Sequence, residues 1–158
     1  GKKEGSMDVE KKLKELGISL PAPPKPVANY VPAVRAGNLL FVSGHGPYND
    51  GKSILSGKLG KELTVEEGYK TARNVALNCL ASIQATLGDL KKVERVVKLL
   101  GMVNCTPEFD QHPAVLNGCS ELLAEVFGTE AGVGARSAFG VGSLPLGVPV
   151  EIEAIFEI

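Results

Sequence analysis

Cysteines, aromatic residues and excess charge are all scarce in this sequence of 158 residues. Three cysteines are an odd number, and no C-x-x-C pair occurs, which argues against a disulfide framework and against a zinc ribbon. There is no tryptophan, and only five phenylalanines and three tyrosines are available for base stacking. A formal net charge of -1 provides no basic field for a nucleic-acid backbone. We therefore expect no nucleic-acid partner.

Long hydrophobic runs are also missing. The apolar stretches are far shorter than a membrane span, and no basic segment followed by an apolar stretch opens the chain. We therefore expect a soluble, cytoplasmic protein without a membrane partner. Residues 1–6, which precede Met7, look like an expression-tag remnant. The hydrophobic content of 44% suits one globular domain over residues 27–158, preceded by a short helix and a connector in residues 7–26.

Hydrophobic periodicity and turn residues predict three helices and about six strands. The expected helices cover residues 7–16, 64–87 and 113–127. The expected strands cover residues 30–34, 39–43, a short stretch near 54–55, 93–103, 136–141 and 148–158. Thr64 and Glu67 form a capping box, and Pro113 suits a first helical position. Four prolines between residues 19 and 27 predict an extended, proline-rich strap.

This order of elements predicts an α+β two-layer sandwich, in which two helices cover one face of a mixed sheet. The final strand alternates apolar and polar positions, as expected for a strand with one buried face. Its outer positions combine Glu151 and Glu153 with Ile155. An uncovered face with apolar residues needs a partner, so we expect a subunit interface there.

The last two predicted strands carry the pattern with the clearest chemistry. Arg136 opens one strand, Glu151 and Glu153 lie in the other, and the Leu-Pro-Leu-Gly connection can turn the chain so that the two strands pair. A guanidinium recognises a carboxylate through two parallel hydrogen bonds, and a nearby carboxylate can move a proton or hold a water. On spacing alone, a surface ion pair between these residues is the simpler interpretation.

The cysteines and histidines separate into core and cleft candidates. Cys79 and Cys119 fall on the apolar faces of predicted helices, which indicates core packing, whereas Cys105 follows a strand and can sit at a cleft. We expect His112 to cap a helix. His45 is either an acid–base group in a cleft or a hydrogen-bonding group that lines it. Two separated histidines do not indicate a metal site, and we expect none.

The end of the chain contains Ala-Arg136-Ser followed by Gly-Ser-Leu-Pro145 and then Val-Glu151-Ile-Glu153-Ala. In residue type and spacing this motif resembles the C-terminal signature of the Rid family, also called YjgF/YER057c/UK114, some of whose members carry the label endoribonuclease L-PSP. The resemblance covers most of the chain, roughly residues 27–158. Further positions match in the same order, namely Tyr30-Val31, Gly37-Asn38, Ser43-Gly44 and Asn117.

The resemblance implies a chorismate-mutase-like fold and a homotrimer with clefts between its subunits. It also implies hydrolytic deamination of 2-imino or 2-enamino acids to 2-oxo acids and ammonia. Arg136 would grip the carboxylate of this small metabolite, and Glu151 would position the attacking water and move a proton. The other implied substrate-binding positions are Tyr30 from the neighbouring subunit, Ser43, Gly44, His45 and Asn117. No cofactor is implied, because the carbon of an iminium ion is already electrophilic.

Three departures from the family pattern leave other functions open. Ala138 stands where family deaminases commonly carry a cysteine, and Ser43-Gly44-His45 replaces Ser-Gly-Gln. The N-terminal helix and the proline-rich strap are additional. One alternative is a non-catalytic binding or regulatory module for small carboxylates. Another is RNA cleavage of the L-PSP type, against which the charge balance argues.

Overall fold

The computed structural model describes residues 8–26, 28–49 and 52–158, so the expected tag remnant lies outside the described residues. The helical elements are α1 (Val9–Glu15), α2 (Val65–Leu87), the 3-10 turn η1 (Leu90–Lys92), α3 (His112–Phe127) and the 3-10 turn η2 (Pro145–Gly147). The strands are β1 (Ala33–Ala36), β2 (Leu39–His45), β3 (Tyr48–Asn49), β4 (Lys52–Ser53), β5 (Arg95–Asn104), β6 (Ala135–Val141) and β7 (Val150–Glu157).

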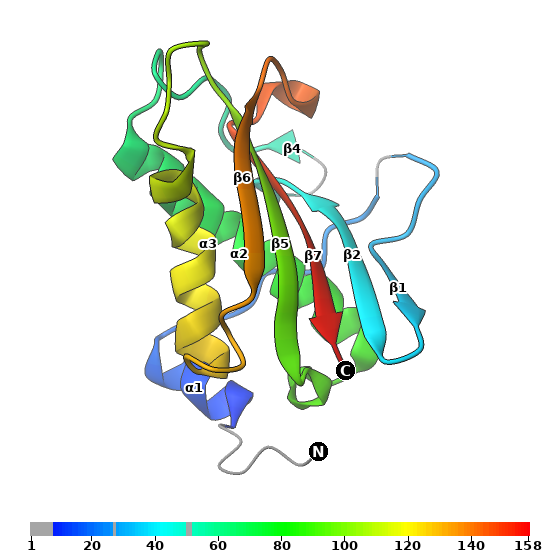
Figure 1. Cartoon of the computed structure of the whole chain (residues 1–158). Coiled ribbons are helices and arrows are strands. Elements are labelled where there is room, and N and C mark those ends of the chain that lie inside the picture. The colour runs from blue at the N-terminus through cyan, green and yellow to red at the C-terminus, as the bar shows by residue number, and fades with distance from the viewer. Residues whose placement is uncertain (1–7, 27, 50–51) are drawn as a thin grey trace.

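Five strands form the main sheet in the order β1-β2-β7-β5-β6, and β3 pairs with β4 separately (Figure 1). The β5–β6 pair is parallel and the other pairs of this sheet are antiparallel. The predicted pairing of the last two strands is wrong, because β5 lies between β6 and β7. The physical reason is that α3 connects β5 to β6 as a crossover, which places β6 beside β5 and parallel to it.

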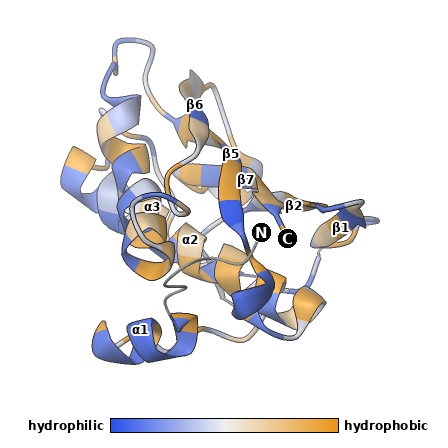
Figure 2. Ribbon diagram, turned by 60° about the horizontal axis from the view of Figure 1, so that its bottom comes forward, coloured by the Kyte–Doolittle hydropathy of each residue, from blue (hydrophilic) through white to orange (hydrophobic). Residues whose placement is uncertain are grey.

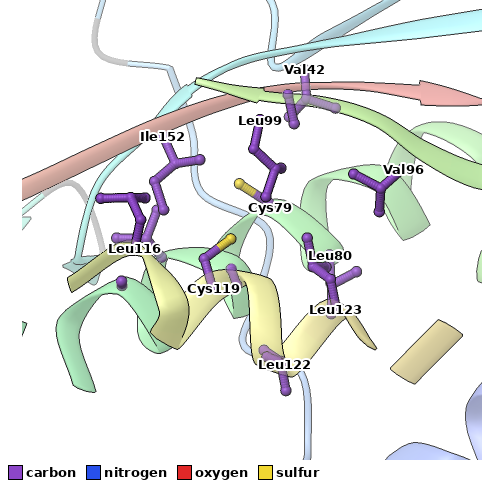
Figure 3. Packing of buried hydrophobic residues seen from close by; sticks show 14 of the residues in the cluster. Val42, Cys79, Leu80, Val96, Leu99, Leu116, Cys119, Leu122, Leu123 and Ile152 are labelled. Atoms are coloured by element: carbon purple, nitrogen blue, oxygen red, sulfur yellow. The ribbon is translucent and has the colours of Figure 1, made fainter. Parts of the chain in front are cut away.

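Helices α2 and α3 pack against each other and against one face of the sheet, which confirms the predicted α+β sandwich (Figure 1). The core between these layers includes Leu99 and Ile152 from the sheet and Leu80 and Leu123 from the helices (Figure 3). Cys79 and Cys119, shown in the same figure, are 4% and 2% exposed and unpaired, so the prediction of core cysteines is confirmed.

The predicted capping box of α2 is confirmed, and Pro113 lies in the first turn of α3, which ends at Gly128 as expected. Thr64 Oγ1 accepts a hydrogen bond from the Glu67 backbone N–H at 3.2 Å, and the Glu67 carboxylate accepts one from the Thr64 N–H at 3.2 Å. This capping box satisfies N–H groups that have no partner inside the helix. The prediction that His112 caps α3 is wrong. The N-cap is Gln111, which makes no side-chain capping bond, and the His112 ring contacts Cys105 instead.

Helix α3 approaches α2 closely because Gly118 has no side chain. A Cβ at this position would overlap the backbone carbonyl of Tyr69 on α2, whose atoms cannot rotate away. The contact therefore sets the position of α3 relative to the rest of the core, and with it the neighbouring Asn117 and Ser120. Gly118 is thus a structural requirement for the site described below.

The N-terminal segment wraps around the helical layer before it enters the sheet. In α1, which Figure 2 shows as a mostly hydrophilic helix, Val9 and Leu13 are buried and the helix contacts α3 and η1. Ile18 and Leu20 of the following strap also pack against the core. This strap is therefore an integral part of the fold.

The sheet face away from α2 and α3 carries exposed apolar side chains. Val34, Phe41 and Ile155 lie opposite one another across β1, β2 and β7, and Val34 and Phe41 are 52% and 44% exposed. Phe139 on β6 is 42% exposed. Such a row is typical of an interface, and the expected subunit contact remains a prediction. Among the described residues, no helix combines the length and hydropathy needed to cross a membrane.

Candidate active site

Arg136 on β6 points toward α3 and is held there by two hydrogen bonds. Its Nη1 donates to Asn117 Oδ1 at 2.9 Å and to Ser120 Oγ at 3.1 Å. The two acceptors are three residues apart and therefore share one face of α3. Because both bonds come from Nη1, the Nε–Nη2 edge of the planar guanidinium remains able to receive a carboxylate through two parallel bonds.

No carboxylate neutralises Arg136 within the described part of the chain. The two ion pairs found there join Lys70 to Glu66 and Arg73 to Glu125, both on the helical layer. The surface ion pair considered for Arg136 from the sequence is therefore wrong. A half-buried cation whose partners are all neutral is suited to bind an anion from outside the chain.

Arg136 and Glu151 lie on opposite faces of the sheet. Arg136 is opposite Leu99 on β5, which in turn is opposite Ala154 on β7, and both of these residues are buried beneath the helices. Glu151 alternates with buried Ile152 and so faces the other way. With β5 between the two strands, one chain cannot bring the guanidinium and this carboxylate together.

Glu151 lies against Gly44 in a partly desolvated environment. A Cβ on Gly44 would be 2.6 Å from Glu151 Oε1, so this close approach of strand and carboxylate needs glycine. Burial, followed by the negative charge of Glu153, raises the pKa of Glu151. A carboxyl whose pKa moves toward neutrality is suited to accept and donate protons.

Tyr48 is a member of this group that the sequence analysis missed. Burial raises the pKa of its phenol, and the neighbouring Glu151 and Tyr30 raise that pKa further, which places the three groups close together. The available signal was an aromatic residue within a turn region rich in glycine and asparagine. Binding residues are often found in loops that a rigid scaffold positions.

A pocket opens beside this group. Tyr30, Gly44 and Tyr48 line it together with Leu146 of η2, and three residues of the N-terminal strap form a further wall, namely Pro24, Lys25 and Pro26. Leu146 has a φ of 59°, the single positive value among the described non-glycine residues, and its side chain is 58% exposed. A strained backbone that projects an apolar side chain at a pocket is typical of a ligand-contacting loop.

His45 is fixed between two hydrogen-bond partners. Its Nδ1 donates to the Ser43 carbonyl at 2.6 Å, because a carbonyl can only accept, and its Nε2 is 2.7 Å from Ser82 Oγ, from which the neutral ring accepts. Burial lowers the pKa of His45, which favours the neutral ring. This geometry favours the hydrogen-bonding role for His45 over the acid–base role.

Ser43 also has a positioning role. Its hydroxyl donates to the Val31 carbonyl at 2.6 Å, and its backbone N–H donates to the Pro32 carbonyl at 2.9 Å. These bonds hold the segment that carries Tyr30, whose side chain is 47% exposed. Ser43 therefore fixes the direction in which Tyr30 extends from the chain.

The predicted site residues thus form two half-sites. The first group, which we call the Arg136 half-site, consists of Arg136, Asn117 and Ser120. The sequence analysis missed Ser120, although it lies one helical turn from Asn117. The second group, which we call the Glu151 half-site, comprises Tyr30, Ser43, Gly44, His45, Tyr48 and Glu151. Glu151 lies on the face of the sheet away from the helices, whereas the His45 ring points toward Ser82 of α2. Among the described residues, no three His, Cys, Asp or Glu side chains gather as metal ligands would.

The fold and the two half-sites define an α+β protein that carries a guanidinium able to bind a small anion and a carboxyl group suited to proton transfer. The family model described as "YjgF/chorismate mutase-like, putative endoribonuclease" matches residues 10–154. The chain belongs to this family. It is 48% identical over 146 residues to protein TCP17 of Trypanosoma cruzi, covering 92% of this chain and 91% of that protein.

Two further similarities bear on structure and function. The crystal structure of Atu1372 from Agrobacterium tumefaciens, a protein of unknown function, superimposes with a TM-score of 0.86 at 46% identity, covering 95% of this chain and 92% of that one. A protein of Dermatophagoides farinae named 2-iminobutanoate/2-iminopropanoate deaminase is 28% identical over 138 residues, covering 87% of this chain and 92% of that protein.

Proposed function

We propose that this protein is a hydrolytic deaminase that converts reactive 2-imino and 2-enamino acids into 2-oxo acids and ammonia. The observation that carries the proposal is Arg136, a half-buried guanidinium that has only neutral partners and a free edge for a carboxylate. The name of the Dermatophagoides farinae relative supports the choice of substrate class.

The proposed site is assembled from two copies of the chain in a homotrimer. Arg136 lies on the edge strand β6, and Glu151 lies on the opposite face of β7 with β5 in between. A second copy can present its Glu151 half-site to the Arg136 half-site of the first. The exposed apolar row on the open face of the sheet supports such an association.

In this assembly the guanidinium of Arg136 holds the substrate carboxylate and so fixes the position of the adjacent C=N carbon. The Glu151 carboxylate takes a proton from a water as the water oxygen bonds to that carbon, and the imine nitrogen is protonated. Glu151 then returns its proton to the amino group of the resulting carbinolamine, and ammonia leaves as the hydroxyl proton is lost to water, which gives the 2-oxo acid. The chemistry requires no cofactor, because the C=N carbon is itself electrophilic.

The test is release of 2-oxo acid from freshly generated 2-iminobutanoate and 2-iminopropanoate. We expect the wild-type protein to accelerate release over buffer, and Arg136→Ala and Glu151→Gln each to reduce kcat/KM by about 100-fold. Because imines also hydrolyse in water, the buffer rate is the baseline for every variant. A correctly assembled wild-type protein that gives only the buffer rate would falsify the proposal for these substrates.

A binding module for small carboxylates is the second candidate, and Ala138 is the observation that favours it. This alanine packs against the core where the family deaminases commonly carry a thiol, so that group is missing from the Arg136 face of β6. Calorimetry with pyruvate and 2-oxobutanoate separates the two functions. Binding that Arg136→Ala abolishes, without turnover of either imine, identifies a binding module.

RNA cleavage, which the family description includes, is tested in the same preparations. Cleavage that persists through purification and is lost in Glu151→Gln would favour a ribonuclease. The neutral His45, which already makes two hydrogen bonds, does not offer this chemistry a free imidazole base.

A further inference from the structure

A cysteine and a histidine that the proposed deamination does not use meet at the end of β5. Cys105 follows this strand directly, and His112 is the first residue of α3. Cys105 Sγ lies 3.5 Å from His112 Nε2, within the range of a hydrogen bond to sulfur. The rings of Phe109 and His112 pack edge to face with their centroids 5.3 Å apart, which restricts rotation of the imidazole beside the thiol.

The pair packs directly against the backbone of Gly140, an approach that a larger residue would prevent. A Cβ on Gly140 would lie 2.7 Å from Cys105 Sγ and 2.7 Å from His112 Nε2. Gly140 is exposed and His112 is half-buried, so the pair lies just beneath the surface, with Cys105 itself 9% exposed. Gly140 shares the α3-facing side of β6 with Ala138 and Arg136, since alternate strand residues point the same way.

A lysine ammonium lies close to the thiol. Lys58 Nζ donates to Asn104 Oδ1 at 2.7 Å and to the carbonyl of Gly142, both neutral acceptors. Its third N–H remains available for an anionic group. The carboxylate of Glu62 is also in this region, where it accepts the backbone N–H of Lys58 at 2.8 Å.

The three cysteines differ in what surrounds them. Cys79 and Cys119 lie deep in the core, where burial raises the pKa of the Cys119 thiol to about 12 and that of Cys79 well above its usual value. Burial also raises the pKa of Cys105, although the charge of Lys58 acts in the opposite direction. The Cys105 thiol is therefore protonated near neutral pH, and its reaction requires a base at the sulfur. His112 Nε2 is at that position.

We propose that Cys105 and His112 form a second reactive site, at which the thiol adds covalently to small α,β-unsaturated carbonyl compounds. His112 Nε2 takes the thiol proton while a sulfur–carbon bond forms at the β-carbon and the π electrons move toward the carbonyl. The imidazolium then returns the proton to the α-carbon. No oxidant, leaving group or second thiol is needed, and Lys58 favours an electrophile that also carries an anionic group.

The test uses N-ethylmaleimide on the folded, assembled protein, with adducts located by peptide mass spectrometry. We expect a single early adduct, on Cys105, and none on Cys79 or Cys119. At pH 7, His112→Gln should slow adduct formation by about tenfold or more and move its pH dependence to higher pH, because general-base assistance is lost. Cys105→Ser should remove the early adduct.

Two glycine variants test the arrangement of the pair against the Gly140 backbone. Gly140→Ala should slow the reaction several-fold, because the new methyl group meets both reactive atoms. Gly142→Ala is the matched control on the same segment, since a Cβ there has no neighbour within 4 Å, and it should react as the wild type does. An anionic maleimide, 3-maleimidopropionate, should react faster relative to N-ethylmaleimide in the wild type than in Lys58→Gln.

Either of two results would overturn the inference. One is an adduct that forms first on Cys79 or Cys119, and the other is a Cys105 rate that His112→Gln leaves unchanged. If His112→Gln fails to fold, the wild-type pH profile still decides. An unassisted thiol would gain about tenfold in rate per pH unit up to its raised pKa, whereas assistance by His112 flattens the profile below that point. The readout is covalent mass, so it is independent of imine turnover.

Discussion

The two half-sites of this protein are built in different ways. The Arg136 half-site is part of the regular framework, since a strand supplies the guanidinium and one face of α3 supplies both acceptors. The Glu151 half-site combines Glu151 of β7 and Gly44 of β2 with Tyr48 of the short strand β3, with η2 and with the segment that carries Tyr30. The first is fixed by packing between a helix and the sheet, and the second combines central strands with short elements beside the sheet.

The charges of the half-sites differ in a complementary way. Arg136 is a cation that no carboxylate of the described residues pairs with, and Glu151 is a carboxyl whose pKa is raised by burial and by a second carboxylate. An opposite charge nearby would stabilise the charged form of each group. One chain holds the two groups on opposite faces of the sheet, so in the proposed trimer this stabilisation would come from a ligand and from a neighbouring copy.

The largest expected effect comes from mixing two inactive variants. Arg136→Ala and Glu151→Gln should each lose about 100-fold in imine turnover. After equal amounts are unfolded and refolded together, random trimers should contain about one site in four with both residues intact, and a corresponding share of activity should return. A double variant mixed with the wild type serves as the control for subunit exchange. If exchanged trimers recover no activity, Arg136 and Glu151 do not act from different subunits, and the proposed pairing of the two half-sites is wrong.

A pair of glycine substitutions should show different effects of the two half-sites on stability. Gly118→Ala should lower the free energy of unfolding by about 3 kcal/mol or more, because the methyl group meets the immobile backbone of α2. Gly44→Ala should cost less than about 1 kcal/mol, because it meets the flexible Glu151 side chain. Urea unfolding measures both.

The same Gly44→Ala variant should nevertheless lose turnover, since its methyl group displaces the Glu151 carboxylate. Equal losses of stability in the two glycine variants would contradict the distinction between the half-sites.

Asn117→Ala should have an intermediate effect on substrate binding. It removes one of the two bonds that hold Arg136, and a hydrogen bond to a charged group is worth about 1.5–3 kcal/mol. We expect KM to rise by about tenfold or more while kcat changes little. Ser137→Ala is the control, because Ser137 adjoins Arg136 but bonds Lys98 on the other face. A kcat effect larger than the KM effect would argue against a binding role for Arg136.

The smallest expected effect is a pH-dependent change in stability in Glu151→Gln. The pKa of Glu151 is higher in the folded than in the unfolded chain, so the folded state binds more protons between these two values. Its stability therefore falls as pH rises from the unfolded pKa through the folded one, and the cost persists above it. Glu151→Gln should be more stable than the wild type at pH 7, by less than about 1 kcal/mol, and equal to it at low pH. Thermal melts of both proteins at pH 7 and at low pH measure the sign of this stability difference.

Local patterns predicted most of the secondary structure. The capping box at Thr64 and the alternation in the last strand correspond to α2 and β7. Boundaries in the first hairpin were less accurate, since β1 spans Ala33–Ala36 and not residues 30–34, and β4 precedes the stretch expected near 54–55. The turn η1 was not predicted. Short elements near turns depend on contacts that the local sequence does not contain.

The sequence by itself determined the α+β class, the buried thiols and the candidate pair Arg136 and Glu151, because periodicity and residue chemistry are local properties. Only the tertiary structure decided which residues meet. It inserted β5 between the last two strands, turned His45 toward Ser82 and brought His112 to Cys105. These outcomes depend on strand order and on the close packing of α2 and α3, and strand order follows from how the whole chain buries its apolar faces.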